Sequence, residues 1–180
     1  MITHIFTFVL AALTGVGQAS LIDWSPARRL NWEDFKAAPD AASTNAALTS
    51  SSINVEFGYD DEELSFTINC RFDKTKSWVK VKTNDILLHE QGHFDIAELH
   101  ARKLNQALKG YRFNAKTVSD DVNRIYDSVM VLHHAAQNEY DKETDFSRKK
   151  DKQLIWQKKI SDNLQDLKAF GSYGTKTTQK

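Results

Sequence analysis

Cysteine is nearly absent from this 180-residue chain. Cys70 is its one thiol, so no intramolecular disulfide can form. The fold must therefore be stabilised by a hydrophobic core and not by cross-links. Cys70 lies in Leu64–Phe72, a run with strand character, where a small buried side chain is a better interpretation than a nucleophile. The length favours one compact domain, because two domains of ordinary size need a longer chain.

An excess of charge is also lacking, since 24 Lys and Arg residues balance 24 Asp and Glu residues. A partner held by net charge, such as a nucleic acid or an anionic membrane, requires an imbalance that this chain does not have. The short basic stretches Lys76–Lys82 and Arg148–Lys152 are more typical of solvated faces than of binding patches. We therefore expect no nucleic-acid partner.

The longest hydrophobic run is too short to span a bilayer as a helix. It covers Ile5–Val16, and its length is typical of the core of a secretory signal peptide. Gly17 and Ala19 are small residues at the positions that a signal peptidase inspects, which predicts a signal peptide over residues 1–19. No cysteine follows the run to carry a lipid, so we expect a secreted or periplasmic protein without a stable membrane anchor. The alternative is a buried N-terminal helix.

Past this leader, the first half of the chain has the pattern of strands. Three are expected: Ile53–Tyr59, Leu64–Phe72 and Ser77–Val81. The first two alternate apolar and polar residues and are separated by the polar turn Asp60–Glu63, which predicts an antiparallel hairpin. Asp40–Ser52, rich in Ala, Ser, Thr and Asn, is expected to be a loop or a polar edge.

The second half has a helical period. Thr83 or Asn84 can cap a first helix that runs to Lys109 and stops at Gly110. Two more helices are expected, one opening at Ser119–Asp121 and one over Asp151–Phe170. Strands first and helices afterwards predict an α+β fold, a small antiparallel sheet followed by three helices. The expected organisation is a single domain over residues 20–170 with a flexible tail over residues 171–180.

The stretch His89–His93 contains the pattern H-E-x-x-H within the first expected helix. Each helical residue advances by ~100°, so His89 and His93 share a face, where two neutral imidazoles can bind one zinc ion. Glu90 is turned ~100° from His89, outside the coordination shell but able to take a proton from water on the metal. The pattern predicts Zn²⁺ bound by His89 and His93, with Glu90 as general base. The alternative is an ordinary polar face on a core helix.

A catalytic zinc needs a third protein ligand, and the residues next to the motif do not supply one. The common extension with a further glycine and histidine is absent, since Ile96 and Leu99 occupy those positions. His100 lies ~10 Å along the helix axis from His93, too far to complete the same site. The third ligand must therefore come from a distant part of the chain.

The segment Asn138–Phe146, at the end of the second expected helix, is the best source of that ligand. If the helix continues, Glu143 shares an inward face with Tyr140, so we expect Glu143 to bind the metal. Asp141, turned ~100° aside, becomes equally good if the helix stops at Tyr140. His133 also lies on the inward face and is the next alternative, although a core histidine is its simpler interpretation.

Several longer patterns accompany the five-residue motif. They are Trp24–Phe35 (W-S-x-x-R-x-L-x-W-x-D-F), Ser77–Val79 (S-W-V), His89–Arg102, Tyr140–Thr144 (Y-D-x-E-T), Gln153 and Trp156. In these the chain resembles the DUF922 family over nearly all of its mature length. The resemblance implies a secreted zinc-dependent protease that groups with the H-E-x-x-H metallopeptidases and has a zincin-like active-site helix.

The chain departs from the family pattern at one position. The pattern has a histidine two residues past the threonine of Y-D-x-E-T, and this chain has Phe146 there. If that histidine were the third ligand, this chain would bind zinc poorly. If the ligand is Glu143 or Asp141, the site is intact.

We therefore expect an exported zinc metallohydrolase, in particular a peptidase that cleaves peptide or protein substrates with metal-activated water. Tyr140 is a candidate for stabilising an oxyanion. The alternative is a non-catalytic extracellular binding module on the same scaffold, which the Phe146 departure favours.

Overall fold

The computed structural model describes residues 20–174 and 176–179, so the expected signal peptide lies outside the described part. The strands are β1 (Leu21–Asp23), β2 (Ala47–Leu48), β3 (Ser51–Tyr59), β4 (Leu64–Asp73), β5 (Trp78–Val79) and β6 (Thr177–Gln179). The helices are α1 (Asn84–Gly110), α2 (Val118–Thr144) and α3 (Lys150–Asp166), with short 3-10 turns η2 (Trp32–Asp34) and η3 (Lys168–Phe170). The fold is α+β, an antiparallel sheet with three helices, as expected.

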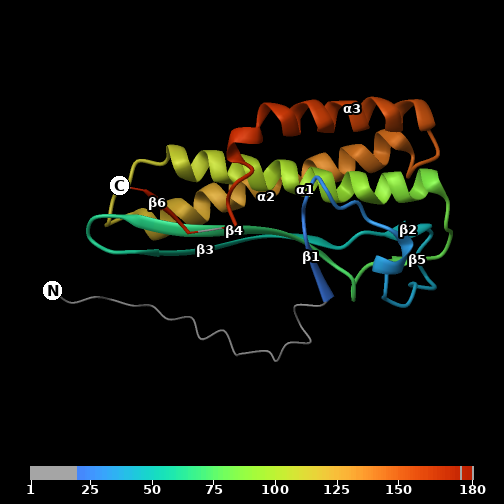
Figure 1. The fold of residues 1–180 in the computed structure, drawn as a ribbon, viewed down its shortest axis with the longest axis horizontal. Helices are drawn as coiled ribbons and strands as arrows, with labels where there is room; N and C mark the ends of the chain where they lie inside the picture. The colour runs from blue at the N-terminus through green and yellow to red at the C-terminus, as the bar shows by residue number, and fades with distance from the viewer. Residues whose placement is uncertain (1–19, 175, 180) are drawn as a thin grey trace.

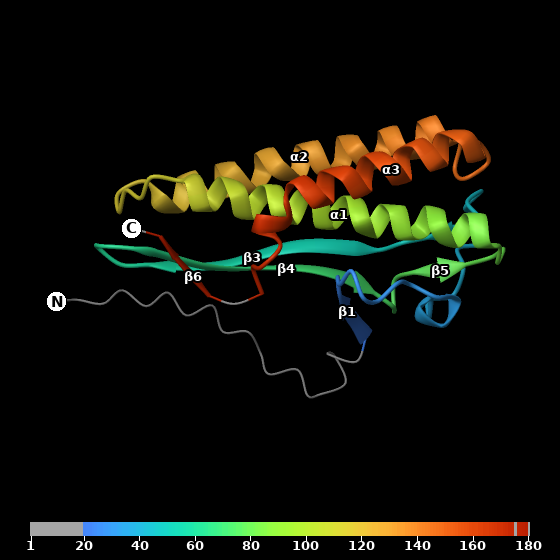
Figure 2. The same ribbon diagram turned by 45° about the horizontal axis from the view of Figure 1, so that its top comes forward.

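The helices lie together on one side of the sheet, with α1 nearest to the strands (Figure 1 and Figure 2). α1 packs against β3 and β4 on one side and against α2 and α3 on the other. It begins where the sequence predicts, because Thr83 Oγ1 accepts a hydrogen bond from Ile86 N at 3.2 Å. No helix in the described part of the chain is both long and apolar enough to cross a membrane.

β4 is the central strand of the sheet. β3 pairs with it antiparallel along its whole length, with Val55 opposite Ile68, which confirms the expected hairpin. On the other edge of β4, β1 pairs near one end and β6 near the other. Alternate residues of β4 are buried, so one face of the sheet packs against the helices. Cys70 is on that face and is 3% exposed, which confirms that it is a core residue.

The segment Asp40–Ser52, expected to be a loop or a polar edge, contains β2 and the start of β3. β2 pairs antiparallel with β5, with Ala47 opposite Val79, and forms a separate two-stranded sheet. This small sheet lies beside the N-terminal end of α1 (Figure 1). It therefore provides one wall next to the H-E-x-x-H motif.

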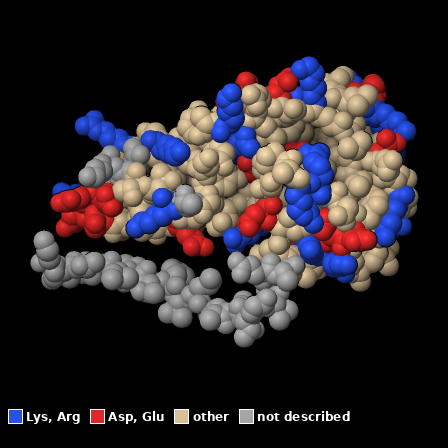
Figure 3. All heavy atoms as spheres, viewed as in Figure 1, with Lys and Arg blue, Asp and Glu red and all other residues tan. Residues whose placement is uncertain are grey.

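Charges of both signs are interspersed over the face drawn in Figure 3, apart from one acidic tip. The tip is the β3–β4 turn, Asp60–Glu63, at the far end of the hairpin. Glu62 N and Glu63 N each donate a hydrogen bond to Asp60 Oδ1 at 2.9 Å. These bonds lower the pKa of Asp60 and fix the turn.

The C-terminal segment corrects an expectation, because its described part packs against the domain where a flexible tail was expected. Tyr173 is 9% exposed, and its hydroxyl donates a hydrogen bond to the carboxylate of Glu98 on α1. Thr177–Gln179 forms β6 on the edge of β4. The physical reason is that Glu98 is buried and needs a polar partner in addition to Arg102.

Replacing Tyr173 with alanine should therefore destabilise the protein. We expect a loss of about 3 kcal/mol in the free energy of unfolding, because a packed aromatic side chain is removed and Glu98 loses a donor. The matched control is Tyr59→Ala, since Tyr59 is 43% exposed and should cost less than about 1 kcal/mol. Urea unfolding of both variants measures the two losses in the free energy of unfolding. Equal losses would show that Tyr173 does not pack as described.

Candidate metal centre

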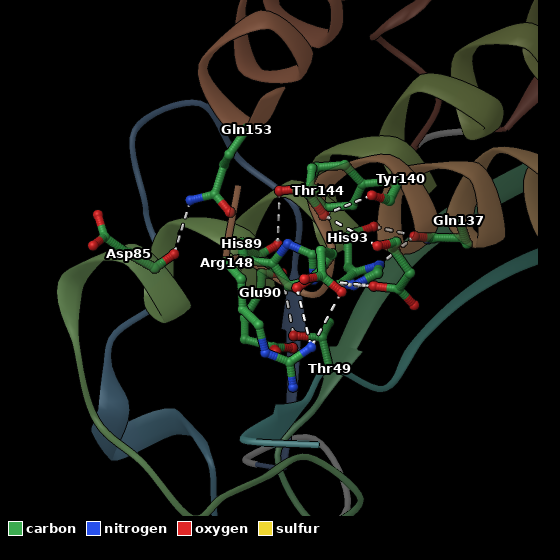
Figure 4. Close-up of polar contacts among 12 residues, drawn as sticks. Thr49, Asp85, His89, Glu90, His93, Gln137, Tyr140, Thr144, Arg148 and Gln153 are labelled. Atoms are coloured by element: carbon green, nitrogen blue, oxygen red, sulfur yellow. Dashed lines mark hydrogen bonds and ion pairs between the residues drawn. The ribbon is translucent and has the colours of Figure 1, made fainter. Parts of the chain in front are cut away.

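The first two candidate ligands lie on α1, one helical turn apart. The Nε2 atoms of His89 and His93 are 3.1 Å from each other, and the two rings stand at 87°. His89 is buried and His93 partly buried, and both line the same cleft. Figure 4 shows the two rings directed toward the side chains of α2, Gln137 among them. The spacing in the sequence therefore brings the two histidines together as expected.

The third member of the centre is Asp141, on the last turn of α2. Its Oδ1 atom lies 3.0 Å from His89 Nε2 and 3.0 Å from His93 Nε2. Within residues 20–174 and 176–179, these three side chains are the one group of His, Cys, Asp and Glu residues whose ligand atoms converge closely enough for a metal ion. We refer to His89, His93 and Asp141 as the triad.

The expectation that Glu143 is the third ligand is corrected by this geometry. Glu143 is exposed, and its Oε2 atom accepts a hydrogen bond from Trp156 Nε1 on α3 at 2.7 Å. Around the axis of α2, Tyr140 lies between Asp141 and Glu143, and it packs against both α1 and α3. From Tyr140, Asp141 is turned ~100° toward the histidines, whereas Glu143 is turned ~60° the other way, toward α3. The inward face of α2 contacts both α1 and α3, and Glu143 faces α3, away from the histidines.

The triad has the dimensions of a zinc site. Ligand atoms separated by 3.0–3.1 Å could all lie at the usual Zn–N and Zn–O length of ~2.1 Å from one ion. Ideal tetrahedral zinc separates its ligand atoms by ~3.4 Å, so the triad needs to open by only a few tenths of an ångström. Two imidazoles and one carboxylate suit zinc and leave a fourth position free. The residues present therefore fit the expected metal.

The electrostatics of the triad favour a cation. Burial acts to raise the pKa of Asp141, but hydrogen bonds to His89 and His93 outweigh it and hold that pKa well below its usual range. Burial likewise acts to lower the pKa of His93, but its hydrogen bond to Asp141 and the charge of Glu90 outweigh burial and raise it. The ionised carboxylate thus stabilises positive charge, a proton or a metal ion, between the three groups.

Glu90 lies beside the triad in an open cleft of about 420 Å³. The cleft is walled by the backbone stretch Asn45–Ser51, which includes β2, and Thr49 Oγ1 donates a hydrogen bond to Glu90 O at 3.1 Å. This contact holds the segment between β2 and β3 against the motif. Glu90 Oε2 is buried and has no hydrogen-bond partner among the described residues. The carboxylate is therefore close to the triad without being one of its members.

Phe146, which stands where the family pattern has a histidine, lies on the rim of this cleft and not in the triad. The chain leaves α2 through Asp145, Phe146 and Ser147, whose φ angles are 48°, 52° and 75°. This left-handed turn leaves Phe146 44% exposed. The triad is complete without a ligand at position 146.

Tyr140 does not have the exposure that an oxyanion donor needs. Its side chain is fully buried, its ring stacks on His89 at a centroid distance of 4.5 Å, and its hydroxyl donates to His89 O at 3.3 Å. Burial raises the pKa of this hydroxyl far above its usual value. Tyr140 therefore orients His89 from behind.

The remaining histidines do not join the triad. His133 is buried and its Nε2 accepts a hydrogen bond from Gln137 Nε2 at 2.9 Å, which corresponds to the core histidine that was the simpler interpretation. His100 Nδ1 contacts Ile96 O at 2.8 Å, away from the centre. Burial lowers the pKa of both rings to about 4, so both are neutral near pH 7.

Comparison with known proteins agrees with the resemblance. A family model described as "Bacterial protein of unknown function (DUF922)" matches residues 22–148, a span that contains the triad and Glu90. The chain belongs to the DUF922 family. No curated protein and no solved structure matches it significantly.

The other motif residues of this DUF922 chain hold α1 in place. Trp24 Nε1 and Gln91 Nε2 each donate to Asp95 Oδ1 at 2.8 Å, and Arg29 pairs with Asp95 Oδ2 at 3.0 Å. Gln91 Oε1 accepts from Leu30 N at 2.7 Å. The N-terminal segment is thus fastened to the helix that carries the histidines.

Two residues next to the triad were not expected from the sequence, Gln137 and Gly92. Gln137 lies one helical turn before Asp141, a spacing that could have identified it. Gly92 lies between the two histidines, where a Cβ atom would overlap the hydroxyl and ring of Tyr140. A glycine is therefore required for Tyr140 to reach His89.

Replacing Gly92 with alanine should displace Tyr140 and disturb the triad. We expect zinc affinity to fall at least about tenfold and the free energy of unfolding to fall by about 2 kcal/mol, as in overpacked cores. Gly110→Ala is the matched control, because a Cβ there meets no atom within 4 Å and should be neutral or stabilising. Chelator competition and thermal unfolding measure the two effects. Unchanged zinc affinity in Gly92→Ala would contradict the role given to Tyr140.

Proposed function

We propose that this DUF922 chain is an exported zinc-dependent metallohydrolase, and that it hydrolyses peptide bonds. The observation that carries the proposal is the convergence of the triad atoms to within 3.1 Å, with Glu90 beside them in the cleft. This N/O ligand set, with one position open, is the kind that catalytic zinc takes in hydrolases.

In the proposed reaction the triad would hold the ion. Zinc supplies a Lewis acid and, when bound, makes a water molecule acidic. Glu90 would accept a proton in the cleft and pass it to the leaving group, as a general base and then acid. Its buried, unpartnered Oε2 supports this role, because a carboxylate oxygen in that state is costly unless the site uses it.

The form of the cleft supports a peptide or protein substrate. One wall is the extended stretch Asn45–Ser51, and Phe146 and Ile86 give apolar surface near the triad. An open cleft beside extended backbone suits a chain-like substrate better than a small enclosed molecule. The leader expected over residues 1–19 supports action outside the cytoplasm, in the periplasm or in the medium.

The ligand assignment predicts different results for two neighbouring acidic residues. Asp141→Ala should lower zinc affinity by about a hundredfold or more, because it removes one of three ligands. Glu143→Ala is the matched control and should leave the affinity unchanged, since Glu143 contacts Trp156 instead. Competition with a chromophoric chelator measures both. Stoichiometric zinc retained by Asp141→Ala, or lost from Glu143→Ala, would overturn the assignment.

Activity tests the proposed reaction. The zinc-loaded protein should cleave members of a broad peptide mixture, detected by mass spectrometry. Glu90→Gln should slow cleavage by roughly 10²–10⁴-fold while keeping stoichiometric zinc, because the amide cannot accept the proton. If the loaded wild-type protein leaves the mixture intact, the proposal fails and a non-catalytic extracellular binding module becomes the better description.

A further inference from the structure

We propose that Gln137 is a positioning residue that accepts a hydrogen bond from His93 Nδ1 and so holds the His93 ring with Nε2 directed at the triad. Gln137 Oε1 lies 2.6 Å from His93 Nδ1, on the side of the ring opposite the triad. An amide oxygen can only accept a hydrogen bond, so His93 Nδ1 must donate. This contact leaves Nε2, which lies 3.0 Å from Asp141 Oδ1, as the ring nitrogen that a metal can bind.

The orientation of the Gln137 amide follows from its other two contacts. Gln137 Nε2 lies 3.0 Å from His93 O and 2.9 Å from His133 Nε2. A backbone carbonyl oxygen only accepts, so the amide nitrogen must face it. A flipped amide would place its oxygen against that carbonyl oxygen. Oε1 is therefore left with one direction, toward His93 Nδ1.

His133 completes this arrangement from one step farther away. Its ring is buried, and burial together with nearby histidines lowers its pKa to about 4, so it is neutral near pH 7. A neutral ring can accept the second Gln137 hydrogen at Nε2, which it does at 2.9 Å. The histidine considered as a possible ligand thus stabilises the residue that orients a ligand.

The two triad histidines differ in this respect. His89 Nδ1 is buried and has no hydrogen-bond partner among the described residues, whereas His93 Nδ1 has Gln137. On the side away from the triad, the His93 ring is therefore held by a hydrogen bond, whereas the His89 ring is held by its stacking on Tyr140. His89 serves as an internal reference for the effect of Gln137.

The first test uses the metal-free protein, in which ¹H–¹⁵N NMR of the imidazole rings detects ring protons that exchange slowly with water. In the wild-type protein, His93 Nδ1 should carry such a protected, hydrogen-bonded proton. Gln137→Met keeps the side-chain length and removes both hydrogen-bonding groups, so this protection should be lost. Gln137→Glu restores an acceptor for Nδ1–H, so the protected proton should return.

Zinc affinity gives the second readout. Gln137→Met should weaken binding by about 10- to 100-fold, the usual effect of losing a hydrogen bond to a ligand histidine, whereas Gln137→Glu should stay within a few-fold of wild type. The matched control is Gln153→Met, because Gln153 is also buried and donates to a backbone carbonyl, Asp85 O at 2.9 Å, outside the triad. It should change neither readout.

The proposal is overturned if Gln137→Met leaves both the protection of the His93 Nδ1 proton and the zinc affinity unchanged, or if Gln137→Glu behaves like Gln137→Met. The affinity readout rests on the proposed zinc site, but the proton-exchange readout needs no metal. A wild-type protein that binds no zinc would therefore refute the proposed function, while the NMR result still decides the role of Gln137.

Discussion

The structure depends on one constraint: the helix that carries the histidines is buried although it is rich in polar residues. The buried polar side chains of α1 are His89, Glu90, Gln91, Asp95, Glu98, His100, Arg102 and Asn105. Buried polar groups need hydrogen-bond partners, and one helix cannot supply them all. Other elements provide them: Trp24 from the N-terminal segment, Asp141 from α2, Leu164 O from α3 and Tyr173 from the C-terminal segment. Much of the fold is arranged to satisfy α1.

Two aspartates, Asp95 on α1 and Asp141 on α2, differ in the partners of their carboxylates. Asp95 receives hydrogen bonds from Trp24, Gln91 and Arg29, so each of its oxygens has at least one donor. Asp141 instead shares one oxygen between two histidines, an arrangement that favours a cation between the three groups. The same residue type is a structural anchor in one position and a candidate metal ligand in the other. The difference lies in whether the neighbouring groups are hydrogen-bond donors or further candidate ligands.

The sequence predicted the parts of the molecule that depend on local patterns. Alternation in Leu64–Phe72, the cap at Thr83 and the spacing of His89 and His93 each act within a few residues, and the structure has all three. It could not predict what depends on partners far along the chain. Whether Asp141 or Glu143 faces the histidines depends on where α3 packs, because α2 presents acids to two neighbours. β1, β2 and β6 are too short for a periodic pattern, and Tyr173 is a lone aromatic residue whose partner, Glu98, lies 75 positions away.

The pairing of β1 and β6 with the same strand has a consequence for the order in which the domain folds. The two strands come from opposite ends of the described chain, and both lie on the edge of β4 that β3 leaves open. Contacts so distant in sequence carry a large loop-closure entropy and form late, whereas the β3–β4 hairpin is local and forms early. We therefore expect the last step of folding to close the sheet and bring Tyr173 to Glu98. On this order, α1 reaches its final surroundings only when β6 has paired with β4.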